Sequence, residues 1–141
     1  MQIDESFDVP QAPDRVGEIV ATDATLLSLF PEARVEIVES DGNARTVLSH
    51  YTALGREGTA TFHFTFESDG SVWFEKVCDG NVWRQLSGSV TLEPRTGGTR
   101  VRIEAEGRTK TLVPEFTIKG PMQDQIGQMA KALRARIEAE A

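Results

Sequence analysis

The sequence has few of the residues on which metal, disulfide and nucleophilic chemistry depend. It has one cysteine, Cys78, which excludes an internal disulfide and fits a reducing compartment such as the cytoplasm. Its two histidines, His50 and His63, and this cysteine are too widely spaced to match a zinc pattern, so we expect no metal and no cofactor. A Gly-x-Ser-x-Gly nucleophile motif is also missing from the sequence.

Long apolar runs and excess positive charge are missing too. No apolar run approaches the roughly 18 residues of a membrane span. The first ten residues lack the basic and apolar regions of a signal peptide. With 15 Lys and Arg against 22 Asp and Glu, the chain is a poor match to nucleic acid, which is bound largely through its phosphates. Its 141 residues predict one domain, 1–141.

The order of elements is strand, two short helices, six strands and a long helix. Alternation in Gln2–Val9 predicts a strand that ends at Pro10, and Pro13 begins a helix to about Ala21. Thr22 or Asp23 can cap a second short helix that ends near Phe30–Pro31. Short joints with turn residues then predict an antiparallel meander. Its strands are Arg34–Glu39, Arg45–Leu54, Thr59–Glu67, Ser71–Cys78, Val82–Leu92 and Thr99–Arg108.

The faces of this sheet follow from the alternation. Val101, Ile103 and Ala105 share one face of the last strand, and charged residues occupy the other, so we expect that other face to be solvated. A three-residue turn at Ser68–Gly70 brings Val72 and Phe74 beside three phenylalanines of the preceding strand.

The next turn decides where the later side chains point. A three-residue turn at Asp79–Asn81 adds Leu86, Gly88 and Val90 to the apolar face, whereas a two-residue turn would send them to the other face. We choose three residues because only this choice gathers the apolar groups. The choice leaves Trp73 and Trp83 on the outer face. Gly88 would then admit a close approach of the C-terminal helix.

The tail from about Pro114 to Glu140 returns to helical spacing. Its apolar stripe consists of Met122, Ile126, Met129, Leu133 and Ile137. Gly120-Pro121 is expected to kink or divide the segment.

This order of elements resembles the START-like superfamily, also called SRPBCC, which includes Bet v 1-type allergens, polyketide cyclases and coenzyme Q-binding proteins. The resemblance covers essentially the whole chain and is carried by residues 7–16, 23–31 and the paired segments 86–92 and 98–101. The N-terminal half is most similar to the coenzyme Q-binding and carbon monoxide dehydrogenase-related members. The resemblance implies an α+β helix-grip fold, in which a seven-stranded curved antiparallel sheet wraps a long C-terminal helix. It also implies an apolar cavity between sheet and helix.

The apolar face is interpreted as a core or as a core that also forms a ligand wall. Its predicted members are Phe62, Phe64, Phe66, Phe74, Leu86, Ile103, Phe116, Met122, Ile126 and Met129. Four polar residues, His50, Tyr51, Lys76 and Arg84, are candidates for the same interior. The alternation does not decide which of His50 and Tyr51 faces inward. His63 is expected on the wet face, opposite Glu75.

Three functions fit this sequence. The first is binding or transport of a small hydrophobic ligand, such as a lipid, an isoprenoid quinone or a polyketide-like molecule, without catalysis. The second is a cyclase or aromatase that uses the same cavity, which requires at least two inward titratable groups close together. The third is a protein-interaction module, such as a homodimer built on Trp73 and Trp83, with a vestigial cavity.

Overall fold

The computed structural model describes residues 1–31, 33–53 and 55–140, without the side chains of residues 53 and 56. These residues form one seven-stranded sheet and three helices. In chain order the elements are β1 (Gln2–Val9), α1 (Pro13–Val20), α2 (Asp23–Ser28), β2 (Arg34–Asp41), β3 (Ala44–Ala53), β4 (Arg56–Phe66), β5 (Val72–Lys76), β6 (Trp83–Arg95), β7 (Gly98–Thr109) and α3 (Glu115–Ala139).

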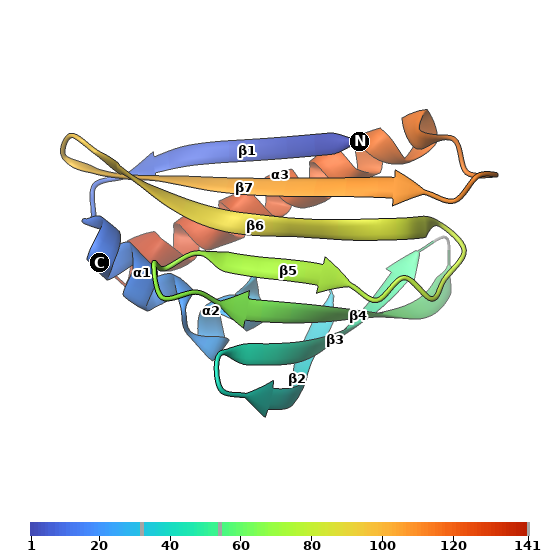
Figure 1. Ribbon diagram of the computed structural model, residues 1–141, viewed down its shortest axis with the longest axis horizontal. Helices are drawn as coiled ribbons and strands as arrows, with labels where there is room; N and C mark the ends of the chain where they lie inside the picture. The colour runs from blue at the N-terminus through green and yellow to red at the C-terminus, as the bar shows by residue number, and fades with distance from the viewer. Residues whose placement is uncertain (32, 54, 141) are drawn as a thin grey trace.

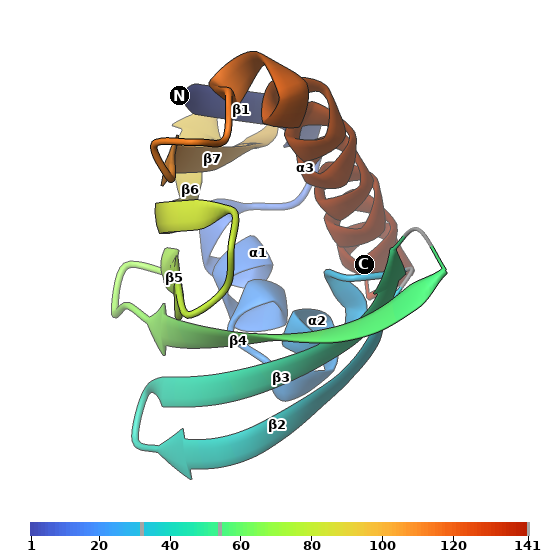
Figure 2. The same ribbon diagram turned by 90° about the vertical axis from the view of Figure 1, so that its right-hand side faces the viewer.

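The sheet is antiparallel throughout, with the strand order β1-β7-β6-β5-β4-β3-β2. It curves strongly, and α3 lies on its concave side (Figures 1 and 2). This helix packs mainly against β1, with further contacts to β7, α1 and α2. The short helices close one end of the curve, and the C-terminus of α3 lies at that same end (Figure 1). The predicted helix-grip architecture is therefore confirmed.

The predicted elements match the observed ones closely. The expected bounds of β1 are exact, and Thr22 caps α2 by accepting a hydrogen bond from the Thr25 amide. The predicted end of β3 at Leu54 lies outside the described residues. Phe64 pairs with Phe74 across β4 and β5, and Phe74 pairs with Gly88 across β5 and β6, so the predicted gathering of apolar groups on one face is confirmed.

The start of β6 differs from the prediction in one physical detail. The joint between β5 and β6 spans Val77–Val82, and the pairing with β7 shifts register between Trp83 and Gln85. A bulge adds one residue to one strand, so the side chain before it lies on the face of the sheet opposite to the one that strict alternation predicts. Trp83 therefore lies on the concave face, against Gly107, and its expected outer position is wrong. Trp73 does lie on the outer face and is exposed.

The convex face carries the charges that the alternation predicted. Arg100 on β7 forms an ion pair with Asp8 on β1 at 2.9 Å, and Arg102 binds Asp4 at 2.5 Å. The hydrogen bond from Arg100 holds the pKa of the Asp8 carboxyl below its ordinary value. His63 pairs with Glu75 in the register and is exposed, as expected.

Helix α3 remains a single helix through Pro121, so of the two expected effects, a kink or a division, the division does not occur. Figure 2 shows its first turn bending away from the line of the following turns. All five residues of the predicted apolar stripe are buried. They belong to one core cluster with residues of β1, β7, α1 and α2. The stripe faces the sheet, and the charged residues of α3 face solvent.

Gly88 is required by a close approach of Phe74 rather than of α3. A Cβ at residue 88 would lie 2.3 Å from both the Phe74 ring and the Glu104 carbonyl oxygen. We therefore expect Gly88→Ala to lower the free energy of unfolding by about 2 kcal/mol, measured by urea denaturation. The matched substitution Gly127→Ala on α3 meets no atom within 4 Å and should stabilise the helix. Equal effects of the two substitutions would contradict this account of Gly88.

Candidate functional site

The concave face carries the predicted apolar residues. Phe62, Phe64 and Phe66 lie on β4, Phe74 on β5, Leu86 on β6 and Ile103 on β7, and all belong to the apolar core or pack against it. Met122, Ile126 and Met129 face them from α3 and are buried. Phe116 does not belong to this wall, because it is exposed on the first turn of α3, before the stripe reaches the sheet.

Toward one end of this face, inward side chains of β3, β5 and β6 are more exposed than those at the middle of the same strands. On β3, the exposed fraction rises from 0 % at Val47 to 5 % at Ser49 and 44 % at Tyr51. On β5 and β6, Val72 and Val90 are buried, whereas Lys76 and Leu86, nearer the other end, are half-buried. Inward-pointing residues that keep contact with solvent define an open end of the concave face.

The opposite, closed end is filled by aromatic rings. Phe30, which follows α2, lies 5.4 Å from Phe62 and 6.3 Å from Phe64, measured between ring centroids. Phe64 in turn lies 5.6 Å from Phe74. These separations fall in the range of favourable aromatic packing. Sequence reasoning missed Phe30, although its four-residue spacing from the apolar Leu26, at the predicted end of the second helix, is a pattern that indicates a shared side.

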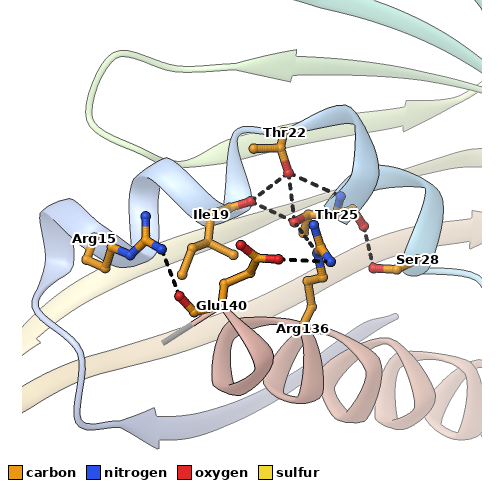
Figure 3. A network of polar contacts seen from close by, with 7 residues as sticks. All are labelled: Arg15, Ile19, Thr22, Thr25, Ser28, Arg136 and Glu140. Carbon is orange, nitrogen blue, oxygen red and sulfur yellow. Dashed lines mark hydrogen bonds and ion pairs between the residues drawn. The ribbon is translucent and has the colours of Figure 1, made fainter.

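A polar network fixes α1, α2 and α3 to each other at the closed end (Figure 3). The buried Thr25 hydroxyl donates to the Ile19 carbonyl oxygen at 2.6 Å and accepts from Arg136 Nε at 3.4 Å. Arg136 also pairs with Glu140, and Arg15 donates to the Glu140 carbonyl oxygen at 2.7 Å. The network holds the C-terminal end of α3 against the two short helices.

Two of the four polar candidates share the concave face. Tyr51 pairs with Gly58 in the register, and its ring lies so close to Gly58 that a Cβ there would be 2.7 Å from the hydroxyl oxygen. Lys76 pairs with Phe62 and is half-buried. Its ammonium donates to the Val77 carbonyl oxygen at 3.2 Å. No carboxylate among the described side chains lies within 4 Å of this ammonium.

The other two candidates point elsewhere. His50 alternates with the inward residues of β3, so it faces outward, where its Nε2 lies 3.3 Å from a Glu36 carboxylate oxygen. Arg84 occupies the bulge of β6, is exposed, and donates to the Thr111 hydroxyl at 2.9 Å. The expectation that Arg84 belongs to the interior is therefore wrong, and of the open pair His50 and Tyr51 it is Tyr51 that faces inward.

A polar hollow of about 520 Å³ lies at the β3–β4 hairpin. Its lining residues are Arg34, His50, Tyr51, Thr52, Glu57, Gly58 and Thr59. The hairpin lies at the opposite end of the molecule from α1 and α2 (Figure 1). The hollow therefore adds polar surface beside the open end.

The described residues include no group of three or more His, Cys, Asp and Glu side chains that could hold a metal ion. None of their helices has both the length and the apolar character that crossing a bilayer takes.

Comparison with known proteins identifies the fold but no sequence family. No family model matches the chain, and neither does any curated protein. Among solved structures, the Zhui aromatase/cyclase from Streptomyces sp. R1128 superposes with a TM-score of 0.81 at 16 % identity, over 98 % of this chain and 93 % of that chain. A START superfamily protein from Mycobacterium smegmatis gives a TM-score of 0.76 at 15 % identity, over 99 % of each chain. The chain has the START-like fold.

A third START-like structure is described as a lipid transfer protein. This STAR-related lipid transfer protein from Xanthomonas axonopodis gives a TM-score of 0.69 at 19 % identity, over 97 % of this chain and 85 % of that chain. START-like structures thus include both an aromatase/cyclase and a lipid transfer protein. At these identities the likeness establishes the shape, and the function has to be argued from the site itself.

The closed end should contribute stability independently of the open end. Thr25→Val keeps the side-chain shape but removes the hydroxyl that donates to the Ile19 carbonyl oxygen and accepts from Arg136 Nε. The Ile19 carbonyl oxygen keeps the Thr22 hydroxyl as a donor, so the cost is that of two lost hydrogen bonds. We expect a loss of about 1–3 kcal/mol in the free energy of unfolding, measured by urea denaturation. Ser28→Ala, which removes only a half-buried hydroxyl bonded to the Thr25 carbonyl oxygen, should cost less. A loss for Ser28→Ala as large as that for Thr25→Val would contradict this assignment.

Proposed function

We propose that this protein binds a small hydrophobic molecule between the open end of the concave face and α3, and carries it without chemical change. Two half-buried apolar side chains of β6, Trp83 and Leu86, lie there on the concave face. A molecule seated among them would remove their remaining apolar surface from water, which is the main favourable contribution to binding of this kind.

One observation carries this proposal, namely the burial gradient along the inward-facing residues. A sheet and helix packed only for stability would bury their facing side chains along their whole length. Here the stripe of α3 is fully buried at Leu133 and Ile137, whereas β3, β5 and β6 leave inward residues partly solvated toward the opposite end. The likeness of the fold to a lipid transfer protein supports the same proposal.

The chemistry of the lining favours loose specificity. Apolar side chains dominate the lining, so affinity depends on the apolar area that the ligand buries rather than on its pattern of polar groups. Burial of about 300 Å² of apolar ligand surface would contribute about 7 kcal/mol, and association entropy takes back a large share. We therefore expect dissociation constants near the micromolar range for elongated molecules such as acyl chains, isoprenoids or polyketides.

A cyclase or aromatase activity is the second candidate, favoured by the likeness to the Zhui structure. Such chemistry needs acid and base groups that converge on one substrate. Tyr51 and Lys76 share the concave face, but β4 separates their strands and the pairing places them at different levels, opposite Gly58 and Phe62. Carriage without reaction therefore suits the residues better.

Binding can be followed through Trp83. In a Trp73→Phe background Trp83 is the only tryptophan, and it borders the proposed site. We expect a brominated fatty acid to quench its fluorescence with a dissociation constant of about micromolar order. Native mass spectrometry of the purified wild-type protein should show a lipid-sized adduct that organic extraction removes.

Two matched substitutions localise the site. Leu86→Glu places a charge on the open end of the concave face and should weaken binding at least about tenfold, because the apolar contact is replaced by a hydrated carboxylate. Leu27→Glu makes the same change on the exposed side of α2 and should leave binding unaltered. The absence of both quenching and adduct would overturn the proposal, and turnover of a polyketide-like substrate would favour the cyclase.

Lys76 should select ligands with an acidic end. Its ammonium is half-buried on the concave face and already directed to a carbonyl oxygen. We expect Lys76→Met to weaken binding of a fatty acid about tenfold but to leave the fatty alcohol of equal length unaffected. Arg84→Met, outside the interior, is the matched control for removal of a positive charge. Equal losses for acid and alcohol would show that Lys76 only supports the local structure.

A further inference from the structure

Two large apolar side chains next to the open end are almost fully exposed. Leu112, in the joint between β7 and α3, is 94 % exposed, and Phe116, in the first turn of α3, is 82 % exposed. No other large apolar side chain described in the structure exceeds 54 % exposure. Leaving two such side chains in water forgoes the burial that a folded chain normally gains, so they call for a physical explanation.

The joint that presents Leu112 is held by several hydrogen bonds. The Val113 amide donates to the Lys110 carbonyl oxygen at 2.8 Å, and the Thr109 hydroxyl donates to the Val113 carbonyl oxygen at 2.7 Å. The Lys110 amide donates to the Val82 carbonyl oxygen at 2.8 Å, and its ammonium donates to the Gly80 carbonyl oxygen at 2.5 Å. Leu112 therefore projects from a turn that is fixed to the neighbouring β5–β6 joint.

The charge around these side chains is opposite to that of the chain. Residues 79–84 and 108–119 contain four basic side chains, Arg84, Arg108, Lys110 and Lys119, and two acidic ones, Asp79 and Glu115. Of the acidic pair, Glu115 lies 3.9 Å from the N-terminal ammonium. The whole chain has a net charge of −7. A basic, apolar surface on an acidic protein gives that protein a preferred orientation toward an anionic partner.

This surface borders the open end of the concave face. Figure 2 looks onto that end and shows the β7–α3 joint, the β5–β6 joint and the β3–β4 hairpin in front, with α1 and α2 behind them. The exposed Arg84 immediately follows Trp83, which lies on the concave face. A partner that covers Leu112 and Phe116 would therefore also sit beside the proposed ligand entrance.

We propose that the docking face, defined as Val82, Arg84, Lys110, Leu112, Phe116 and Lys119, binds the surface of an anionic lipid bilayer. Leu112 and Phe116 enter the boundary between headgroups and acyl chains, while the basic residues contact the acidic headgroups. The rest of the acidic chain is repelled by the same surface, so the open end faces the bilayer.

A second copy of the chain is a poorer occupant of this face. In a two-fold symmetric contact the same patch meets itself, which would bring the basic residues of both copies together. Two exposed apolar side chains also supply little of the roughly 1,200–2,000 Å² that a stable protein interface buries. A bilayer accepts both the apolar and the basic groups without such an area.

The test is co-sedimentation of the full chain with vesicles of phosphatidylcholine alone and of phosphatidylcholine with phosphatidylserine. We expect binding only to the vesicles with phosphatidylserine, weakened by added salt. Leu112→Ser and Phe116→Ser should each reduce it about tenfold, and Lys119→Gln about fivefold. Val38→Ser and Trp73→Ser, at exposed apolar side chains on other surfaces, are the matched controls and should bind as wild type.

Because Leu112 and Phe116 are exposed, their substitution should leave the thermal unfolding temperature unchanged, which separates lost docking from lost folding. The proposal is overturned if the wild-type chain ignores both kinds of vesicle, or if the Leu112→Ser and Phe116→Ser variants bind as well as the controls. It is also overturned if light scattering shows a dimer that these two substitutions dissolve. Fatty acid quenching of Trp83 without vesicles tests ligand binding separately, so each proposal can fail alone.

Discussion

The concave face of the sheet is broader than one helix can cover, and the rest of the structure depends on this mismatch. Helix α3 packs mainly against β1, at one edge of the seven strands, and its buried stripe is a single row of side chains. The remaining concave surface of β3 to β6 has to find other partners. At one end α1, α2 and Phe30 supply them. At the other end the described side chains leave inward residues partly in water.

This division separates the stabilising parts of the fold from the adaptable ones. The closed end combines tight aromatic packing with the Thr25–Arg136 network, which ties three helices together. The open end is made of strand ends and joints, whose geometry can vary without loss of the core. An aromatase/cyclase and a lipid transfer protein have this same fold at low sequence identity.

Most of the fold could be predicted from the sequence, because its signals are local. Alternation set the strands, the spacing of Met122 to Ile137 set the inner stripe of α3, and Pro13 and Thr22 marked the starts of the short helices. The site was harder to predict, because the face of the sheet on which a side chain lies depends on the exact number of residues in each joint. One bulge at Arg84 moved Trp83 to the concave face.

The same limit explains the polar candidates. Sequence alone left His50 and Tyr51 interchangeable, since either parity satisfied the alternation. The pairing of β3 with β4 decides between them and puts Tyr51 on the concave face with Lys76. Among the described side chains, Tyr51 and Lys76 lie on separated strands of this face, where they can orient a ligand by its polar end but do not form an adjacent acid and base that could move a proton through a reaction. Physical placement of these groups, more than likeness of shape, is therefore the argument for a carrier.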